Sequence, residues 1–358
     1  MFDNRIYNFS AGPSMLPLKV LERSAAEITN YAGSGMSVME MSHRSKVYAK
    51  IFDETQAKFR SLMQIPDNYE ILFLQGGATT QFSAVAMNLI GMTGKADYAI
   101  TGNFATSAWK EAKRYGEARA VCSSEDASHS YIPKEFAVNP DASYFYYCSN
   151  NTIYGTQWKQ TPDAGNIPLV CDMSSDIASR VIDVSKYGVI YAGAQKNLAP
   201  AGLTIVIVRK DLLGHALPQT PLMLDWKVAA ENGSMYNTPP CWCIYILGLV
   251  CDWLQEQGGI AGIQEFNEKK AAMLYDALDQ TNLFISHARK EDRSTMNVTF
   301  RTNSPELDAK FIAQAEAMGL CNLKGHRKVG GMRASIYNAM PIEGVEMLCD
   351  YLLKFDRA

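Results

Sequence analysis

Short apolar runs alternate with polar turns and helical segments through the first two thirds of the chain. Residues 70–90 have the sequence EILFLQGGATTQFSAVAMNLI, in which the continuous apolar run Ile71–Leu74 precedes a glycine turn and a helical segment. Residues 96–116, ADYAITGNFATSAWKEAKRYG, repeat this plan. Continuous apolar strands are typical of a sheet that is covered on both faces. Their alternation with helices predicts an α/β fold with a mostly parallel central sheet, and Thr79 or Thr80 is the expected cap of the first helix.

Four further segments have the same form, an apolar run that ends in a polar loop. They are ASYFYYCSNNTIYGT (142–156), IPLVCDMSSDI (167–177), VSKYGVIYAGAQK (184–196) and LTIVIVRK (203–210). Ligands of open parallel sheets bind outside the carboxyl ends of the strands. We therefore expect the functional residues in the loops that follow these runs.

The pattern changes after about residue 260. A strand (294–302), a helix (304–319), a second strand (330–339) and a closing helix (341–355) predict a compact α+β unit. A chain of 358 residues is too long for one small core, and the glycine-rich stretch EQGGIAG (256–262) is the expected junction. The sequence thus predicts a large domain, 16–260, and a smaller C-terminal domain, 261–358, which the N-terminal segment 1–15 joins.

Composition excludes several classes of protein. The formal net charge is −3, from 34 basic and 37 acidic residues, and it does not favour a nucleic-acid partner. The first residues lack the apolar core of a signal peptide. The longest apolar stretch, Cys241–Cys251, is far shorter than the roughly 20 residues of a membrane-spanning helix. The eight cysteines form no CxxC pair, so we expect no metal site, no disulfide and a cytoplasmic location.

A lysine stands where the flanking sequence predicts an interior position. Lys196, in GAQKN, follows the apolar run Val189–Ala192 and precedes a second apolar run. Lysine is rarely buried without a partner, and a strand-end lysine that extends into solvent is the ordinary alternative. Asp172, however, ends a neighbouring predicted strand, and a buried carboxylate requires a cation or a donor.

Two further features extend this group. The turn Gly76-Gly77-Ala78-Thr79 opens a helix, and the free N–H groups of a helix start bind anions well. Phe104 follows another strand and could cover a flat ring. Taken alone, the glycine turn is equally well explained as an ordinary strand–helix turn, and Phe104 is better explained as a phenylalanine of the core. A lysine that forms an imine, a carboxylate for a pyridinium nitrogen and a helix start for a phosphate are together the requirements of pyridoxal phosphate (PLP).

The motifs NFSAGPSMLP (8–17), MSHRS (41–45), GAQKN (193–197), YNTPP (236–240) and GHRKVGGMRASIYNAMP (325–341) give a specific resemblance. Over essentially the whole chain, the sequence resembles the phosphoserine aminotransferases, which belong to class V and have the type I fold of PLP enzymes. The resemblance implies a homodimer that converts O-phospho-L-serine and 2-oxoglutarate into 3-phosphohydroxypyruvate and L-glutamate. It also implies 4-phosphohydroxy-L-threonine, of pyridoxine synthesis, as a second substrate.

The resemblance also assigns roles to residues. Lys196 would bind PLP covalently and act in catalysis with Asp172, the partner of the ring nitrogen. The other implied cofactor-binding residues are Ala78, Thr79, Phe104, Thr152 and Gln195, together with Asn237 and Thr238 from the neighbouring subunit. Phe104 stands where many relatives have tryptophan, and residues 78–80 depart from a turn that contains glycine and arginine.

The substrate carries a carboxylate and a phosphate. Arg44 and Arg333 are candidates for the carboxylate, because a guanidinium group binds it with two parallel hydrogen bonds. His43, His326 and Arg327 are candidates for the phosphate, and a cleft between two domains could bring the two His-Arg pairs together.

Two alternatives to an aminotransferase remain at this point. A cysteine desulfurase would have histidine where Gln195 stands, and a protein that binds PLP or phosphate without catalysis would not need both arginines and the lysine.

Overall fold

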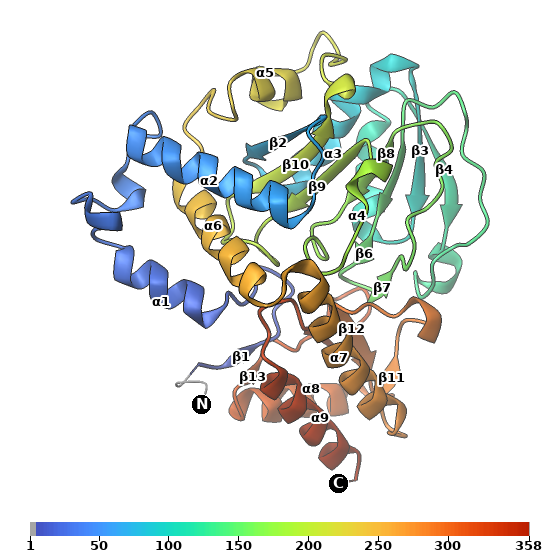
Figure 1. Cartoon of the computed structure of the whole chain (residues 1–358). Helices are drawn as coiled ribbons and strands as arrows, with labels where there is room; N and C mark the ends of the chain where they lie inside the picture. Colours follow the sequence, from blue (N-terminus) through green and yellow to red (C-terminus); the bar gives the residue numbers. More distant parts are fainter. Residues whose placement is uncertain (1–4, 358) are drawn as a thin grey trace.

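The computed structural model describes residues 5–357 and divides into a large α/β part and a smaller C-terminal part (Figure 1). The large part is built on a seven-stranded sheet with the order β2-β10-β9-β8-β5-β3-β4. Its strands are β2 (Tyr69–Leu74), β3 (Lys95–Ile100), β4 (Glu117–Ser123), β5 (Phe145–Cys148), β8 (Leu169–Asp172), β9 (Val189–Gly193) and β10 (Thr204–Arg209). Only β10 runs antiparallel to its neighbours, so the prediction of a mostly parallel sheet is confirmed.

Helices cover both faces of this sheet, as the continuous apolar strands predict. Alternate residues of β5 point to opposite faces, so that Tyr146 packs with α3 (Gly77–Leu89) and α4 (Asn103–Ala112), whereas Tyr147 packs with α2 (Lys46–Leu62) and α6 (Cys241–Glu256). Both faces of the sheet are therefore buried.

Helix α3 begins earlier than the sequence predicts. Its N-cap is Gly76, whose φ of 93° is in the left-handed region that glycine adopts without steric cost. Thr80 already lies in the first turn and donates a 2.8 Å hydrogen bond to the Gly76 carbonyl. The prediction that Thr79 or Thr80 caps this helix is therefore wrong, because the two glycines allow the helix to start directly after the strand.

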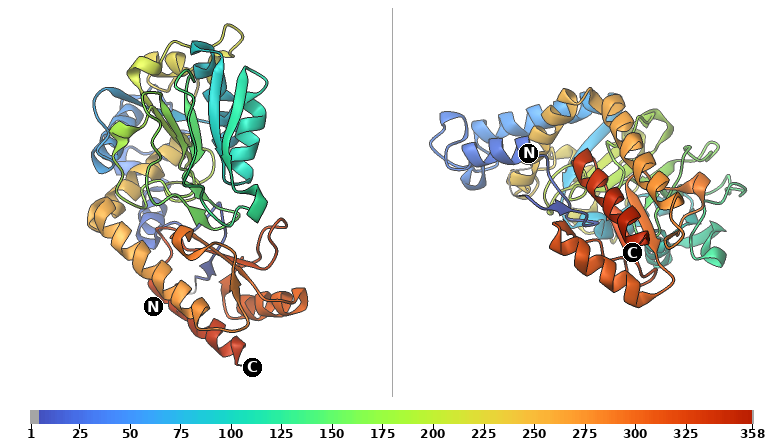
Figure 2. Two further views of the ribbon diagram at one scale, coloured as in Figure 1. Left: turned by 90° about the vertical axis from the view of Figure 1, so that its right-hand side faces the viewer. Right: turned by 90° about the horizontal axis from the view of Figure 1, so that it is seen from below.

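The C-terminal part contains a second, smaller sheet. Strands β11 (Ile285–Ser286), β12 (Asn297–Arg301) and β14 (Met332–Ser335) are antiparallel and pack with α7 (Gly259–Asp279), α8 (Pro305–Ala317) and α9 (Ile342–Asp356). The N-terminal strand β1 (Tyr7–Asn8) pairs in parallel with β13 (Leu320–Cys321). Figure 2 shows the N-terminal segment beside this part, although the two are more than 300 residues apart in the sequence.

Helix α7 connects the two parts. Ile260 and Ile263, near its start, belong to the core of the large sheet, whereas Leu274 and Leu278 belong to the core of the small one. The boundary between residues 260 and 261 stays a prediction. The remaining α-helices and strands among residues 5–357 are α1 (Leu18–Glu27), α5 (Trp226–Glu231), β6 (Asn150–Asn151) and β7 (Thr156–Gln157). Among residues 5–357, no helix is both long enough and apolar enough to cross a membrane.

Candidate active site

The carboxyl ends of three adjacent strands bring the central residues together. Strand β5 leads into Thr152, β8 ends at Asp172, and β9 leads into Lys196. The strands are in register here, because Cys148 of β5 lies opposite Asp172, which in turn lies opposite Tyr191 of β9. Residues that are 20 to 44 positions apart in the sequence thus share one edge of the sheet.

Lys196 points into this edge. Its Nζ donates a 2.8 Å hydrogen bond to Oγ1 of Thr152 and lies 5.5 Å from the centre of the Phe104 ring. Burial lowers the pKa of the ammonium group; Asp172 opposes this effect and Arg333 adds to it. A lysine with a lowered pKa has a larger fraction of free amine, which is the form that attacks a carbonyl group.

Asp172 is a buried carboxylate with 3% of its surface exposed. Its Oδ1 accepts a 2.9 Å hydrogen bond from the Ser174 N–H. Burial raises the pKa of Asp172, whereas the side chain and N–H of Ser174 and the charge of Lys196 counteract this effect. None of the ion pairs formed among residues 5–357 involves Asp172, so its charge still lacks a close cationic partner.

The N-terminal segment packs against the lysine loop, which the sequence did not indicate. The Ser14 N–H donates to the Gln195 carbonyl at 3.0 Å, and the Ser14 hydroxyl donates to the Lys196 carbonyl. A Cβ atom at Gly12 would lie 3.1 Å from Cγ of Lys196, and the φ of Gly12 is +138°. A glycine is therefore required where this segment passes the lysine.

Of the predicted phosphate-binding residues, Ala78 and Thr79 lie in the first turn of α3, whereas Gln195 follows β9. Ala78 and Gln195 are half-buried and Thr79 is exposed. The first N–H groups of a helix have no acceptor within the helix, so this turn offers free donors. Asn237 and Thr238 are exposed in the single chain, and the Asn237 amide donates to the Gln75 side chain at 3.2 Å, directly before the turn.

The C-terminal part contributes Arg333, from β14, and the loop that precedes it. Nη1 of Arg333 donates to the Thr152 carbonyl at 3.4 Å, and burial lowers the pKa of Arg333. His326 is half-buried; burial lowers its pKa, and the charge of Arg333 lowers it further. Arg327 is exposed. The predicted residues Arg333 and His326 are thus close enough to interact.

Lys328 also joins the site, although the sequence reasoning missed it. Its ammonium group donates to the Asn103 side chain at the start of α4, next to Phe104. This contact ties the loop 325–331 to the edge of the large sheet. A signal was available in the sequence, since Lys328 belongs to the basic run His326–Lys328.

His43 and Arg44 are not brought to the other site residues within one chain. They lie between α1 and α2, in a segment at the left edge of the molecule in Figure 1. Arg44 is exposed, and Nε2 of His43 is buried without a hydrogen-bond partner among residues 5–357. A cleft between the two parts of one chain therefore does not unite the two His-Arg pairs.

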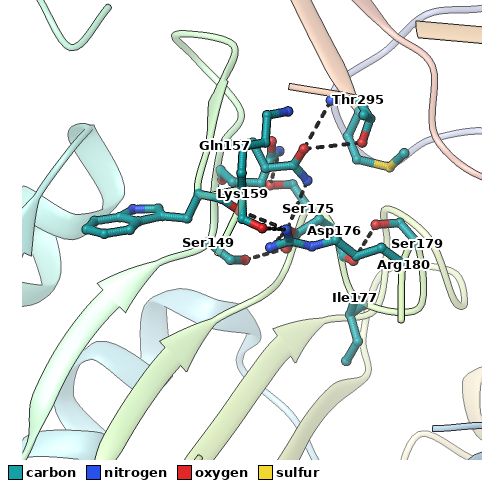
Figure 3. A network of polar contacts seen from close by, with 12 residues as sticks. Ser149, Gln157, Lys159, Ser175, Asp176, Ile177, Ser179, Arg180 and Thr295 are labelled. Carbon is teal, nitrogen blue, oxygen red and sulfur yellow. Dashed lines mark hydrogen bonds and ion pairs between the residues drawn. The ribbon is translucent and has the colours of Figure 1, made fainter. Parts of the chain in front are cut away.

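A second buried carboxylate, Asp176, stabilises the loop after Asp172 (Figure 3). It accepts hydrogen bonds from the Ser149 hydroxyl and, at 3.2 Å, from the Gln157 amide. The Gln157 side-chain oxygen accepts in turn from the N–H and the hydroxyl of Thr295, both at 3.2 Å. Because Thr295 lies two residues before β12, this network connects the edge of the large sheet with the C-terminal part.

The residues at this edge fit PLP. Asp172 is a buried carboxylate without a cation, and a protonated ring nitrogen would supply one. Lys196 is a half-buried lysine with a lowered pKa, and the start of α3 provides N–H donors for a phosphate. Among residues 5–357, no group of three or more His, Cys, Asp or Glu side chains could hold a metal ion.

Comparisons with known proteins agree with this geometry. The family model described as aminotransferase class-V matches residues 6–348. The phosphoserine aminotransferase of Listeria monocytogenes is 54% identical over 99% of this chain and 97% of its own length. That of Nitrosomonas europaea is 52% identical and covers 99% of both chains.

Solved structures give the same result. The phosphoserine aminotransferase from Bacillus circulans subsp. alkalophilus superposes with a TM-score of 0.96 at 46% identity, over 99% of both chains. A PLP-bound phosphoserine aminotransferase from Trichomonas vaginalis superposes with a TM-score of 0.93 at 41% identity, over 97% of this chain and 99% of the other.

Proposed function

Because the chain belongs to the class-V aminotransferase family, we propose that it binds PLP and transfers the amino group of O-phospho-L-serine to 2-oxoglutarate. The products are 3-phosphohydroxypyruvate and L-glutamate. The observation that carries this proposal is the approach of Lys196, Asp172 and Arg333 to one sheet edge, in a chain about half identical to phosphoserine aminotransferases over its full length.

When it is bound, PLP supplies an electron-accepting ring that stabilises negative charge at the substrate Cα. Lys196 binds the cofactor and, as a free amine, takes the Cα proton as general base and returns it as general acid. Thr152 orients the Lys196 amine through their hydrogen bond. Asp172 would hold a proton on the ring nitrogen of PLP, and Phe104 would cover the ring.

The substrate is bound by its two anionic ends. Arg333, fixed by its hydrogen bond to the Thr152 carbonyl, binds the carboxylate close to Lys196. His326 and Arg327, on the loop before β14, bind the phosphate. In this arrangement, the amino group faces Lys196 and the phosphate faces the C-terminal part.

The remaining residues reach the site in a homodimer. Arg44, Asn237 and Thr238 are exposed in the single chain, and large exposed apolar residues lie near both segments: Ile28, Met36, Met39, Val47, Leu222, Met223 and Tyr236. Such a surface is typical of an interface, and in a two-fold dimer each copy gives and receives the same contact. Arg44 and His43 then bind substrate in the partner's site, and Asn237 and Thr238 bind the PLP phosphate there.

A charged residue at this surface tests the dimer. The side chain of Met39 is 57% exposed, and Met39→Glu should shift sedimentation toward the monomer and reduce activity.

The cell compartment is proposed to be the cytoplasm. The cysteines of residues 5–357 are free thiols, which persist in a reducing environment.

The decisive experiment compares amino-group donors. Purified holoprotein is given 2-oxoglutarate with phosphoserine, serine or 4-phosphohydroxy-L-threonine, and glutamate formation is followed. We expect turnover with phosphoserine that exceeds turnover with serine by orders of magnitude. Equal rates with serine would contradict the proposed substrate. In a separate incubation with cysteine, release of sulfide would indicate a desulfurase. If no amino acid changes the absorbance of PLP, the protein only binds the cofactor.

A further inference from the structure

A buried asparagine lies where the two parts of the molecule meet. Asn297, on β12, is completely buried. Its side-chain oxygen accepts a 2.7 Å hydrogen bond from the side-chain amide of Asn150, on β6 of the large part. Its Nδ2 donates to the Ser335 hydroxyl at 2.9 Å and to the Tyr337 hydroxyl at 3.1 Å. One side chain thus connects the edge of the large sheet with β14 and with the segment that follows β14 (Figure 1).

The neighbouring hydroxyl groups fix the direction of these hydrogen bonds. Each hydroxyl has one hydrogen to donate. The Ser175 hydroxyl donates to the Asn150 carbonyl at 2.9 Å, so it accepts from the Asn150 amide at 2.8 Å. The Tyr337 hydroxyl donates to the Ala11 carbonyl at 2.7 Å, so it accepts from Asn297. The position of Asn297 therefore requires one acceptor and two donors, which an amide side chain supplies.

The turn between β6 and β7 packs on β12 beside Asn297. A Cβ atom at Gly155, whose φ is +74°, would lie 2.9 Å from the Asn297 carbonyl oxygen. The Thr299 hydroxyl donates to the Ile153 carbonyl at 3.4 Å. Thr152, which contacts both Lys196 and Arg333, lies in this turn. The contacts with β12 therefore hold the turn that touches the lysine.

The same contacts set the position of Arg333. In the pairing of β12 with β14, Asn297 lies opposite Ser335 and Thr299 lies opposite Arg333. Opposite residues of paired strands share a sheet face, and so do residues two positions apart on one strand. All four side chains thus lie on the face of the small sheet that meets the turn between β6 and β7.

We propose that Asn297 is a positioning residue for the substrate carboxylate: it ties β14 to the edge of the large sheet and so sets the distance between the Arg333 guanidinium group and Lys196. This inference rests on the proposed function, in which Arg333 binds the carboxylate. A guanidinium group binds a carboxylate through two parallel hydrogen bonds, and this geometry tolerates little displacement.

Leucine at position 297 tests this role. Its volume is similar, but it leaves the buried Asn150 amide without its acceptor, and an unpaired buried donor is unfavourable. We expect β12 and β14 to move away from β6, and Arg333 to move with β14. Ser335→Ala is a milder variant, because it removes one acceptor of the Asn297 amide and keeps the other two hydrogen bonds.

The large part supplies a matched control. Asn88, on α3, is almost completely buried, and its side chain also makes three hydrogen bonds to other residues. Its amide donates to the carbonyls of Ala84 and Leu224 at 2.8 and 2.7 Å, and its oxygen accepts from the Trp226 N–H at 3.0 Å. Asn88→Leu thus removes an equivalent buried amide that does not connect the two parts.

The experiment compares two ligands that differ only in the carboxylate. L-glycerate 3-phosphate has a hydroxyl in place of the amino group of phosphoserine, and 2-hydroxyethyl phosphate is the same molecule without the carboxylate. Neither can be transaminated. Their dissociation constants are measured by isothermal titration calorimetry on purified holoprotein of the wild type, Asn297→Leu, Ser335→Ala and Asn88→Leu.

The ratio of the two constants reports recognition of the carboxylate. The wild type should prefer L-glycerate 3-phosphate. Asn297→Leu should reduce this preference about five- to tenfold, the effect of roughly one hydrogen bond to a charged group, and should leave binding of 2-hydroxyethyl phosphate nearly unchanged. Ser335→Ala should reduce the preference about twofold, because two of the three hydrogen bonds remain.

A purely structural role would lower the number of binding sites or weaken both ligands equally, and the ratio would stay the same, as we expect for Asn88→Leu. An unchanged ratio in both Asn297→Leu and Ser335→Ala overturns the inference, and if Asn297→Leu does not fold, Ser335→Ala decides alone. A wild type without any preference also overturns it, because Arg333 would then not bind the carboxylate. If the ratios are as expected but the wild type does not transaminate phosphoserine, the role of Asn297 stands and the proposed substrate is wrong.

Discussion

The Lys196 ammonium lies 2.8 Å from the hydroxyl of Thr152, whose carbonyl oxygen accepts a hydrogen bond from Arg333. One threonine therefore contacts the lysine with its side chain and the arginine with its backbone. The lysine comes from the large sheet and the arginine from the small one, so Thr152 fixes the distance between the base and the substrate carboxylate.

The first prediction concerns the hydroxyl of Thr152. Thr152→Val keeps the shape of the side chain but removes the acceptor that orients the Lys196 amine. We expect kcat to fall about tenfold, which corresponds to one hydrogen bond to a charged group. Steady-state kinetics with phosphoserine provides the measurement. Thr204→Val is the control, because the buried hydroxyl of Thr204 has no hydrogen-bond partner among residues 5–357. Equal losses in both variants would argue against an orienting role.

The second prediction separates the two ends of the substrate. Arg327→Ala should lower kcat/KM for phosphoserine by about 10- to 100-fold and leave the low rate with serine nearly unchanged, since only the phosphate contact is lost. Arg333→Ala should reduce kcat/KM for both amino acids, because both have the carboxylate. If Arg327→Ala reduces the two rates by the same factor, Arg327 does not bind the phosphate.

The third prediction concerns pH. Burial holds the pKa of Lys196 below its usual 10.5, and the charge of Arg333 contributes to the shift. Only the free amine attacks the aldehyde of PLP, so PLP association with the apoprotein should rise with pH and level off below pH 10.5. Arg333→Gln removes a positive charge, which raises the pKa of Lys196 and moves this rise to higher pH. Arg114→Gln, at an exposed arginine, should leave the profile unchanged. A profile identical in all three proteins would exclude the effect of Arg333.

Much of this arrangement could be predicted from the sequence. The continuous apolar runs of β5, β8 and β9 indicated buried parallel strands, and the rule that ligands bind at their carboxyl ends pointed to Lys196 and Asp172. The resemblance to the class-V family and the α/β fold are both confirmed.

The contacts between distant segments could not be predicted in this way. Gly12 and Ser14, near the N-terminus, pack against the loop of Lys196, which is more than 180 residues away in the sequence. The spacing of apolar residues along the chain gives no information about such a contact. Tyr191 was taken as one apolar residue in a buried strand. Its hydroxyl lies 2.7 Å from that of Tyr146, and this contact depends on the arrangement of strands in the sheet, which local patterns do not determine.

One further buried lysine holds the segment that follows Arg333. Lys270, on α7, is completely buried, and its Nζ donates to the carbonyls of Ile336, Tyr337 and Met340 at 3.1, 2.7 and 3.1 Å. Burial lowers the pKa of Lys270 strongly. In the same segment, the Asn338 N–H donates to Oδ1 of Asn197, next to Lys196, at 3.1 Å. Lys270 thus stabilises a turn that contacts the lysine loop.

The fourth prediction follows from these three carbonyl groups. Lys270→Met fills a similar volume but leaves three buried acceptors without their donor, and each such group costs about 1–3 kcal/mol. The gain from no longer burying an amine offsets part of this cost, so we expect the free energy of unfolding to fall by about 2–4 kcal/mol. Lys269→Met, at the exposed neighbouring position on α7, should change it by less than about 0.5 kcal/mol. Urea unfolding of both variants, followed by circular dichroism, gives the comparison. Because the turn also contacts Asn197, kcat should fall in Lys270→Met even under conditions where the protein remains folded.

If Lys270→Met proves as stable as Lys269→Met, water or a shifted backbone satisfies the three carbonyl groups.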